Sequence, residues 1–589
     1  MCGIIGFGWP SEEYLTKSLS VISHRGPDDE GIFIDDFVSL GHKRLSILDL
    51  SERGRQPMSK LKYTITFNGE IYNFNEIKKE LSEYNFETTS DTEVIIYAYD
   101  KWKYECLEKF NGMFSFCIYD HESKELFLAR DRFGIKPLYY INENNIVFCS
   151  EIKGLLHFLD KKEIDHDGLL QFFNFRFTLG ETTLLKNIKK FLPGHYMVYS
   201  LTENKVKKYC RYYFLKTHEK EKKPFSFYSN KLEELIEEAV KRRMVADVPV
   251  ACFLSGGVDS SVIAAIAKKY NENLNTFSIG FDTTNELSYA KTVSDHIHSR
   301  HFEFKIDKSN VLDYLQDMVW HMDEPIGDPG FLPIFVLSKE ASKYNKVVLS
   351  GDGADEVLCG YDRYKFLFYG GYLNHLIFFD SKNDIIKRLK RMRNKDDYES
   401  FFEIIRLFDD SELERLSLSN YNAKQFWKNS FDNSVSNAQL FDIETLLPND
   451  FFMKADKMSS AFGLEQRVPF LDYEVVEFAF SIPFNYKLRF WNEKYILKKS
   501  FEKILPPITV KRRKHGFNVP FDYWFKGVLG DLLNEYLVKE NHGLYNREYV
   551  FELLNLIKNA GNNYKLNFIL AQKLWSILIF EMWYEKYLN

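Results

Sequence analysis

The stretch Leu254-Ser255-Gly256-Gly257-Val258-Asp259-Ser260-Ser261 decides the fold of the second part of the chain. It follows an apolar run, residues 250–254, which predicts a short buried strand, and it leads into residues 261–269, whose alanines and isoleucines predict a helix. A strand that breaks at paired glycines and opens into a helix presents unpaired backbone N–H groups at the positive end of that helix. This arrangement suits a phosphate.

The side chains of this loop indicate which kind of phosphate site it is. Ser255, Ser260 and Ser261 can donate from their hydroxyls, whereas Asp259 would repel an anion unless Mg²⁺ lies between them. The lysine of the Walker A loop is absent, which argues against a P-loop ATPase. An ordinary strand-to-helix turn is the structural alternative, but three serines and an aspartate in this order favour ATP with Mg²⁺.

A second glycine turn, Ser350-Gly351-Asp352-Gly353-Ala354-Asp355-Glu356, follows another apolar run. Between the two turns, strand patterns at 276–281 and 302–306 alternate with a helical pattern at 286–298, which indicates a parallel α/β sheet. Two such loops leaving adjacent strands favour one shared site over an acidic surface loop. Asp259 and Asp355 are then candidates to hold Mg²⁺ against a polyphosphate.

Composition limits the class of protein. A chain of 589 residues favours two to four domains, and 45% hydrophobic with 28% charged residues is ordinary for a folded soluble protein. The net charge of −6 gives no overall attraction for nucleic acid, and the seven scattered cysteines without a C-x-x-C pair fit free thiols. The start carries no secretory pattern, and the most apolar late segment, 568–583, contains Gln572, Lys573 and Glu581. We therefore expect a cytoplasmic protein that does not span a membrane.

Cys2 is the first candidate for chemistry in the N-terminal part. Removal of the initiator methionine would give Cys2 a free α-amine, which titrates at about pH 8 and can serve its own thiol as a base. That is the arrangement of an N-terminal nucleophile. The alternative is an inert cysteine at a frayed terminus.

Other polar motifs interrupt a strand-rich pattern that indicates α+β layers. Arg44 lies near one end of the strand pattern 42–49 and can bind a carboxylate through a bidentate fork, or lie on the surface. Asn68-Gly69 is a strong hairpin signal, although its amide and N–H could instead form an oxyanion hole. Asp91 and Glu93 begin a predicted helix, where carboxylates also complement the helix dipole.

Six segments of the first part match, in the same order, the sequence motifs of one known domain family. They are residues 1–6, 24–28, 44–47, 68–73, 90–93 and 130–138. Together they resemble the class II glutamine amidotransferase domain, which implies a four-layer αββα fold of the N-terminal nucleophile type. By this resemblance Cys2 attacks the side-chain amide of glutamine and releases ammonia, while Asn68 and the Gly69 N–H stabilise the oxyanion. The implied glutamine site consists of Arg44, Ile47, Asn68, Gly69, Glu70 and Asp91, with Arg44 on the carboxylate and Asp91 on the amine.

The two glycine loops resemble those of ATP-pyrophosphatase domains, whose members adenylylate a substrate. With Gly360-Tyr361 and the run Val468-Pro469-Phe470-Leu471-Asp472, nearly the whole chain resembles the glutamine-hydrolysing asparagine synthetases. The resemblance implies that Lys494 contacts the transferring phosphoryl group. Lys499 or the run 511–514 could meet the pyrophosphate. The implied ATP site consists of Leu254, Ser255, Gly256, Gly257, Asp259, Ser260, Ser261, Ile279, Ser350 and Gly351, with Asp259 and Asp355 for Mg²⁺.

The expected organisation is a glutaminase domain at 2–212, a linker at 213–229 containing the charge-rich run 216–223, and an α/β synthetase domain at 230–589 with a parallel sheet and extra helices. Residues 365–450 and 525–589 are expected to be mostly helical, with aromatic faces such as Phe401-Phe402, and to cover the synthetase site. Homodimerisation is compatible with this organisation.

The implied reaction uses glutamine, ATP and aspartate and proceeds through a Cys2 thioester, ammonia and an aspartyl-adenylate. The acceptor is open, because Asp352 stands where some members carry glutamate, a group proposed as a base toward ammonia. Residues 323–330 also differ from members with threonine and arginine near aspartate. The alternative is amidation of another carboxylate, such as a sugar acid of a surface polysaccharide. A β-lactam-forming synthetase is a weaker alternative, because that branch lacks the N-terminal cysteine. An inactive assembly protein on the same fold is also disfavoured, because such a protein would not need its catalytic residues, yet every expected side chain is present.

Overall fold

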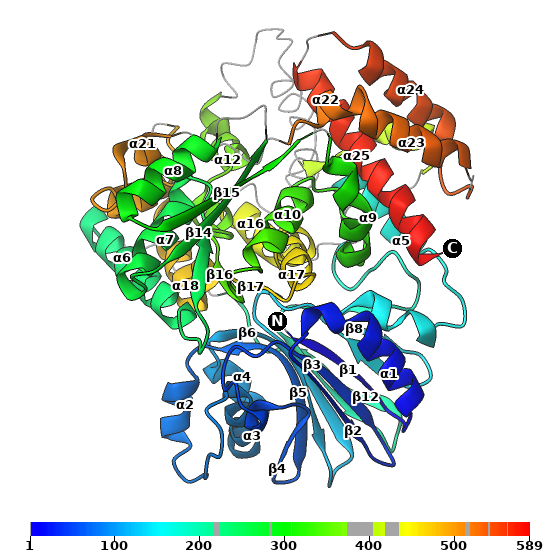
Figure 1. Ribbon diagram of the computed structural model, residues 1–589, viewed down its shortest axis with the longest axis vertical. Coiled ribbons are helices and arrows are strands. Elements are labelled where there is room, and N and C mark those ends of the chain that lie inside the picture. The colour runs from blue at the N-terminus through cyan, green and yellow to red at the C-terminus, as the bar shows by residue number, and fades with distance from the viewer. Residues whose placement is uncertain are drawn as a thin grey trace.

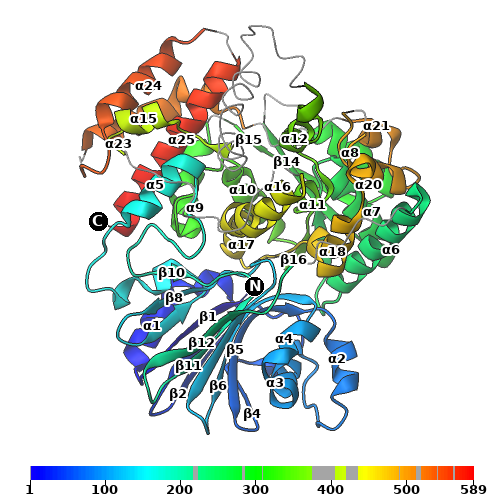
Figure 2. The same cartoon turned by 180° about the vertical axis from the view of Figure 1, so that it is seen from behind.

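The structure is a computed structural model and describes the chain except residues 1, 216–222, 282–285, 308, 374–404, 419–434, 490, 513–518, 540–541, 562–563 and 589. Figures 1 and 2 show an N-terminal half of sheets flanked by a few helices, below a C-terminal half of sheet and helices. In both views the N-terminal end of the chain lies at the junction between the halves. Of the predicted charge-rich linker run 216–223, only Lys223 is among the described residues.

The N-terminal half is built on antiparallel sheets. Within the described residues, one has the strand order β10-β8-β9-β1-β3-β2 and another the order β12-β11-β7-β6-β5-β4. The strands of the first sheet are β10 (Lys189–Lys190), β8 (Tyr139–Asn142), β9 (Ile146–Cys149), β1 (Gly3–Phe7), β3 (Ser39–Arg44) and β2 (Asp29–Ile34). Those of the second are β12 (Lys205–Arg211), β11 (His195–Ser200), β7 (Glu125–Arg130), β6 (Gly112–Asp120), β5 (Tyr63–Ile71) and β4 (Met58–Lys60).

Alternation along the strands sorts side chains into layers. Ile4 packs with Cys117 of the other sheet, whereas its neighbour Ile5 shares a core with Leu15 of α1 (Glu12–Val21). On the second sheet, Phe116 shares a core with Ile95 of α3 (Asp91–Trp102), beside α2 (Phe74–Glu80) and α4 (Cys106–Lys109). This order of helix, sheet, sheet and helix confirms the predicted αββα fold.

The hairpin alternative at Asn68-Gly69 is wrong, because both residues lie inside β5 and pair with Ser115 and Phe114 of β6. Gly69 has a φ of 151°, and a Cβ there would lie 2.0 Å from the carbonyl oxygen of Met113. The position therefore requires glycine because another strand approaches closely.

The C-terminal half contains a parallel sheet with the order β15-β14-β13-β16-β17. The strands are Arg300–Ile306, Asn275–Phe281, Val250–Phe253, Val347–Leu349 and Glu465–Arg467. The chain passes from β13 to β14 and β15 on one side and returns to β16 on the other, so the strand order reverses between β13 and β16. Parallel sheets bind ligands at such a reversal, beyond the carboxyl ends of the strands. Both glycine turns lie there, which confirms the predicted sheet and the adjacency of its two loops.

Helices account for much of the remaining chain. α5 (His166–Phe175) belongs to the N-terminal half by sequence but lies beside α25 (Tyr564–Tyr587) and α9 (Val311–Met322) in both views (Figures 1 and 2). Other described helices are α6 (Phe225–Arg243), α7 (Val258–Tyr270), α8 (Glu286–Ile297), α10 (Phe331–Ala341), α11 (Ala354–Leu358), α12 (Asp362–Leu373), α15 (Asp410–Arg415), α16 (Val435–Phe441), the π-helical η7 (Asp442–Phe451), α17 (Phe452–Ser460), α18 (Tyr473–Ser481), α19 (Phe484–Lys487), α20 (Tyr495–Ser500), α21 (Pro507–Lys511), α22 (Phe521–Phe525), α23 (Val528–Lys539) and α24 (Arg547–Asn559). The predicted Phe401-Phe402 face lies outside the described residues.

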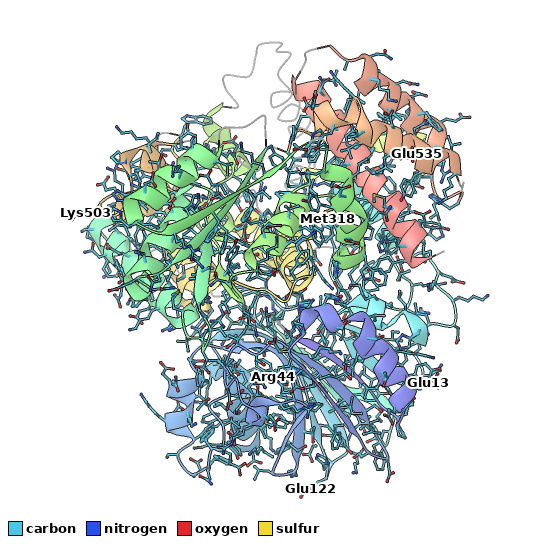
Figure 3. All side chains as sticks on the ribbon, viewed as in Figure 1. Glu13, Arg44, Glu122, Met318, Lys503 and Glu535 are labelled. Atoms are coloured by element: carbon cyan, nitrogen blue, oxygen red, sulfur yellow. The ribbon has the colours of Figure 1, made fainter. Side chains whose placement is uncertain are left out.

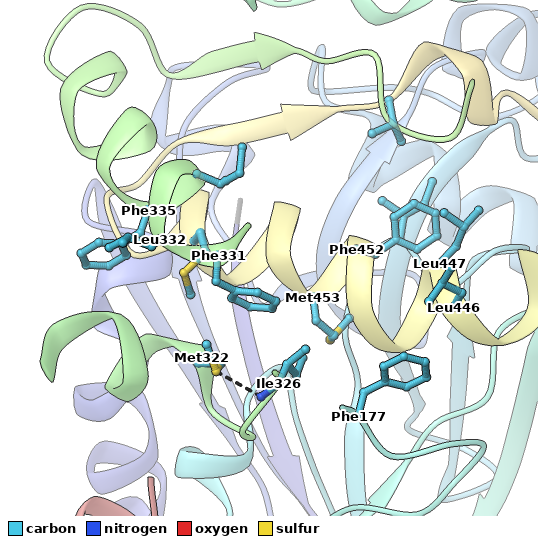
Figure 4. Close-up of a cluster of buried hydrophobic side chains, with 14 of the residues drawn as sticks. Phe177, Met322, Ile326, Phe331, Leu332, Phe335, Leu446, Leu447, Phe452 and Met453 are labelled. Atoms are coloured by element: carbon cyan, nitrogen blue, oxygen red, sulfur yellow. Dashed lines mark hydrogen bonds between the residues drawn. The ribbon is translucent and has the colours of Figure 1, made fainter. Parts of the chain in front are cut away.

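Apolar side chains from both parts of the chain meet where the halves join. Figure 4 shows Phe177 near Met453 of α17 and Leu446 of η7, with Phe331 of α10 close by. The Ile326 N–H donates to the sulfur of Met322 at 3.2 Å in the same cluster. These side chains form one continuous core with that of the parallel sheet. Among the described residues, no helix has the length and apolar character needed to cross a membrane.

Candidate functional site

Cys2 lies just before β1, partly buried at the junction of the halves. Its backbone nitrogen, which becomes the α-amine once Met1 is removed, donates to Asn68 Oδ1 at 3.0 Å. Its carbonyl accepts from Nε of the fully buried Arg25 at 2.9 Å. Burial raises the pKa of the Cys2 thiol, against the opposing effect of the positive chain terminus. The thiol therefore needs a nearby base to ionise, and the amine held by Asn68 is in position to be that base.

The two predicted oxyanion donors, the side-chain amide of Asn68 and the N–H of Gly69, lie in β5, and Asn68 contacts Cys2 directly. The Asn68 Nδ2 group is buried and has no hydrogen-bond partner among the described residues. The Phe114 N–H donates to the Asp131 carboxylate, and the Phe114 carbonyl accepts from the Asp131 N–H. Both hydrogen bonds lie on the side of β6 that faces away from β5. Gly69, opposite Phe114, therefore forms a non-hydrogen-bonded pair, and its N–H points away from β6. A buried donor without a partner is costly unless a ligand accepts from it.

The remaining predicted glutamine residues surround this point. Figure 3 labels Arg44 within the N-terminal half; its guanidinium donates to the carbonyls of Ser51 at 2.9 Å, Leu48 at 3.4 Å and Asp49. These hydrogen bonds do not exhaust its donors. Ile47 is buried, and its carbonyl accepts from the Asp247 N–H of the C-terminal half at 2.9 Å.

Asp91 is the buried first residue of α3, capped by Ser90. One of its carboxylate oxygens accepts from the Ile71 N–H at 2.8 Å. Burial nevertheless raises the pKa of Asp91 to about 7. Its neighbour Glu93 instead accepts from the Thr88 N–H at 2.8 Å and holds the loop before the helix. Asp91 thus faces the Cys2 side of β5, while Glu93 has a structural role.

Glu70 connects this site to the second half of the chain. Its carboxylate lies 3.1 Å from the guanidinium of Arg467 in β17, and Arg467 also pairs with Glu465 at 2.8 Å. Arg25 forms a second connection, with Asp456 of α17 at 2.7 Å and Glu151 at 2.8 Å. Our sequence reasoning missed Arg467 and Asp456. A signal was available, since residues 465–467 immediately precede the quoted run 468–472, but isolated charges give no indication of burial.

The first glycine loop has the predicted strand, turn and helix. α7 begins at Val258, earlier than expected, so that Asp259, Ser260 and Ser261 lie in its first turn. Gly256 has a φ of 71°, and a Cβ there would lie 2.5 Å from the backbone of α8. A Cβ on Gly351 would lie 2.7 Å from the Ser260 nitrogen, so the two glycine loops touch. The loops therefore share one site.

A cavity of about 660 Å³ opens over both loops. Most of the predicted nucleotide residues line it: Leu254, Ser255, Gly257, Asp259, Ser260, Ile279, Ser350 and Gly351. Gly256 and Ser261 do not line it, because Gly256 turns toward α8 and the Ser261 hydroxyl donates to the Gly257 carbonyl at 2.6 Å. Lys499 pairs with Glu502 away from the cavity, whereas Arg512 lines it; Arg513 and Lys514 lie outside the described residues.

Lys494 lies between the two predicted metal ligands, 2.5 Å from Asp259 and 2.6 Å from Asp355. Burial lowers the pKa of Lys494, but the two carboxylates raise it by more, so the pKa lies above its usual value. A Cβ on Gly360 would lie 1.8 Å from Asp355, so glycine lets the chain pass behind this cluster. The pair fits Mg²⁺, because that ion commonly takes one or two carboxylates and completes its shell with substrate phosphates and water.

Asp352 is held from two sides at the edge of the same cavity. Its carboxylate accepts from the Ser350 hydroxyl at 2.8 Å and from the side-chain amide of Gln466 at 2.6 Å. Gln466 is the central residue of β17, between Glu465 and Arg467. Sequence reasoning missed Gln466, whose role depends on a strand pairing that no local pattern reveals. One short strand thus contacts Glu70 beside Cys2 and Asp352 beside the cavity over the glycine loops.

Comparisons with known proteins agree on both halves. A family model described as asparagine synthase matches residues 231–585, and one described as a glutamine amidotransferase domain matches residues 1–210. The chain is 34% identical to glutamine-hydrolyzing asparagine synthetase 1 of Bacillus subtilis (strain 168), over 99% of this chain and 96% of that protein. It is 38% identical to a putative glutamine-hydrolyzing asparagine synthetase 2 of Methanocaldococcus jannaschii, over 66% of this chain and 79% of that protein. A solved B. subtilis glutamine phosphoribosylpyrophosphate amidotransferase aligns at 15% identity over 51% of this chain and 65% of that chain, with a TM-score of only 0.28.

Proposed function

The chain belongs to the asparagine synthase family and is a glutamine-hydrolysing enzyme of that class, and from this premise we propose that it amidates aspartate through a Cys2 thioester and an aspartyl-adenylate. The observation that carries the proposal is the arrangement of β17. Consecutive residues of this strand hold Glu70, beside the cysteine, and Asp352, beside the cavity of the glycine loops. An enzyme that passes ammonia from one site to another needs such a fixed relation between them.

In the first step the Cys2 thiol attacks the γ-carbonyl carbon of glutamine. Its proton passes to the α-amine and then to the leaving ammonia, and water later cleaves the thioester to glutamate. Asn68 Nδ2 and the Gly69 N–H stabilise the oxyanion, a role supported by the unpartnered Asn68 donor. Arg44 and Asp91 hold the carboxylate and ammonium of glutamine, because a zwitterion needs one fixed cation and one fixed anion. Glu70 and Ile47 complete the site.

In the second step the β-carboxylate of aspartate attacks the α-phosphorus of ATP, and pyrophosphate leaves. The backbone of the first glycine loop, with Ser255 and Ser260, binds phosphates at the N-terminus of α7. Held by Asp259 and Asp355, Mg²⁺ would offset the charge of the polyphosphate. Lys494 then supplies a positive charge to the transferring phosphoryl group, which its buried position between these carboxylates supports.

In the third step ammonia displaces AMP from the acyl-adenylate and gives asparagine. Asp352 is the proposed base toward ammonia, oriented by Ser350 and Gln466. Because ammonium is not a nucleophile, the ammonia released at Cys2 must arrive unprotonated. The apolar cluster between the halves, which includes Phe177 and Met453, supports a path shielded from water.

An acceptor screen tests the function. The enzyme should release AMP and pyrophosphate from Mg-ATP with aspartate plus glutamine or ammonium. Release with a sugar acid but none with aspartate would establish the rival, an amidotransferase of another carboxylate. The variant Cys2→Ala should abolish glutamine-dependent synthesis and retain ammonium-dependent synthesis, whereas loss of both would contradict separate sites. N-terminal sequencing that finds Met1 retained would remove the proposed base.

A further inference from the structure

The cavity over the glycine loops is also lined by polar groups that the nucleotide motifs do not explain. Four of them are Arg176, Asp328, Lys454 and Gln572. They come from the end of α5, the loop before α10, helix α17 and helix α25, four segments far apart in the sequence. A site assembled from such distant segments is set by tertiary packing and can recognise a second substrate beside ATP.

Arg176 enters this cavity from the N-terminal half of the chain. It caps α5 with a φ of 75°, its N–H donates to Phe172, and its carbonyl accepts from the Gly327 N–H at 2.8 Å. A Cβ on Gly327 would lie 2.2 Å from Ser576 Oγ of α25 and 3.0 Å from Arg176 Cβ. Three segments therefore fix the backbone of Arg176. Within the described part of the chain, no carboxylate lies within ion-pair distance of its guanidinium, whose hydrogen bond to the Phe175 carbonyl is long, at 3.5 Å.

Asp328 and Lys454 form a pair of opposite charge in the same wall. Their charged groups lie 2.5 Å apart, and the second oxygen of Asp328 accepts from the Gly330 N–H at 2.9 Å. A carboxylate retains further lone pairs in this arrangement. Beside them, burial raises the pKa of Asp450 to about 7, so it is largely uncharged in slightly acidic solution. Lys454 is thus paired with Asp328, whereas Arg176 has no carboxylate within ion-pair distance among the described residues, so its positive charge is available to an amino acid with two carboxylates.

The same pair lies close to the group proposed to meet ammonia. Burial lowers the pKa of Lys454, but the nearby carboxylates raise it by more, so the pKa lies above its usual value. These carboxylates are Asp328, Asp450 and Asp352. Asp352 and Lys454 both line the cavity over the glycine loops. A molecule bound at Asp328 and Lys454 would therefore extend toward Asp352 and the glycine loops.

We propose that Arg176, Lys454 and Asp328 form the acceptor subsite and bind the α-amino and α-carboxylate groups of an amino acid, leaving its side-chain carboxylate at the glycine loops. The inference rests on the proposed function and makes it more specific. Arg176 and Lys454 bind the α-carboxylate, for which the guanidinium offers a bidentate fork. Asp328 binds the α-ammonium, a group that a sugar acid lacks, so the subsite selects an amino acid such as aspartate.

The test uses the full-length enzyme with Mg-ATP, ammonium and varied aspartate. We expect Arg176→Met to raise KM for aspartate about 10- to 100-fold, the effect of losing a charge-assisted hydrogen bond, and to leave KM for ATP and glutamine hydrolysis unchanged. Arg176→Lys should restore part of the loss. Arg415→Met, which removes an exposed arginine paired with Glu552, is the matched control and should change nothing. An unchanged KM for aspartate would overturn the subsite, as would an equal rise for ATP, since the latter indicates a structural role.

Two analogues test the groups separately. Succinate keeps both carboxylates of aspartate but has no ammonium, and β-alanine keeps the amine and one carboxylate. As competitive inhibitors both should bind at least about tenfold more weakly than aspartate, and Asp328→Asn should weaken aspartate without weakening succinate. Either analogue binding as tightly as aspartate would overturn the subsite alone. Wild-type enzyme that adenylylates only a carboxylate without an amine would overturn the proposed function and the subsite together.

Discussion

Arg467→Met should loosen the contact between the two halves of the enzyme. Arg467 is fully buried; it pairs with Glu70 and Glu465 and donates to the carbonyls of Arg243 at 2.9 Å and Val245 at 2.7 Å. Burial lowers its pKa, while Glu70 and Glu465 raise it more, so the charged form is strongly favoured. Methionine fills most of the volume but removes the cation paired with Glu70, and it leaves Glu465 with the more distant Lys136, at 3.9 Å.

The structure sets the size of the effect. Removing one partner of a buried ion pair costs about 3–5 kcal/mol. Glu70 can relieve part of this cost by taking up a proton, because burial already raises its pKa well above the usual range. We therefore expect about 3 kcal/mol, which corresponds to roughly 100-fold faster hydrogen exchange where the opening is local.

Hydrogen exchange of amides in β17 and β5 measures this opening directly and does not assume that a chain of several domains unfolds in one step. A second readout is the ratio of asparagine formed to glutamine hydrolysed, which should fall as the halves separate. Arg300→Met, on the opposite edge of the parallel sheet, is the control because that arginine is exposed. Unchanged exchange in both strands, together with an unchanged ratio, would refute the claim that Arg467 holds the junction.

Three further predictions concern single residues. Because burial raises the pKa of Asp91 to about 7, its contribution to stability is full below the unfolded-state pKa of 3.8 and is lost as pH rises through about 7. Binding of the glutamine ammonium needs the ionised form of Asp91, which is lost as pH falls. KM for glutamine hydrolysis should therefore rise about tenfold per pH unit below about 7, and a KM that does not change with pH would contradict this. Gln466→Leu removes the 2.6 Å hydrogen bond to Asp352 and should slow ammonium-dependent synthesis about tenfold without altering glutamine hydrolysis. Lys494→Met should lower aspartate-dependent AMP release at least about 100-fold while hydrolysis of glutamine persists; a loss below about tenfold would rule out its role at the phosphoryl group.

Sequence reasoning succeeded where local pattern and function coincide. The strand, glycine turn and helix from Val250 to Tyr270 are encoded by contiguous residues, and the strand–helix alternation predicts that the second loop lies next to the first. The hairpin alternative failed at Asn68-Gly69 because pairing with β6 overrides the turn preference of two residues. The same pairing leaves the Gly69 N–H pointing away from β6. The β5–β6 pairing therefore explains both why the hairpin prediction failed and why this N–H is available for the proposed oxyanion site.

The residues that sequence reasoning missed share a physical cause. Arg467, Asp456 and Arg176 are ordinary charged residues by sequence, and charged residues are usually exposed. Their importance arises only when the halves dock and remove them from water. Arg176 is the clearest case, because a residue from the N-terminal half lines a cavity of the C-terminal half. No periodicity or spacing within either half predicts that contact.

The geometry of β17 explains why the two sites are coupled through a strand. Successive side chains of a strand point to opposite faces, so a segment of three residues presents Glu465 and Arg467 to one side and Gln466 to the other. Arg467 holds Glu70 near Cys2, and Gln466 holds Asp352 near the cavity over the glycine loops. The backbone between them is also fixed, since the Ser350 N–H donates to the Arg467 carbonyl at 3.0 Å. Any shift of this strand relative to the N-terminal half therefore moves Asp352. The base proposed to meet ammonia is thus positioned by the same strand that holds Glu70 of the proposed glutamine site.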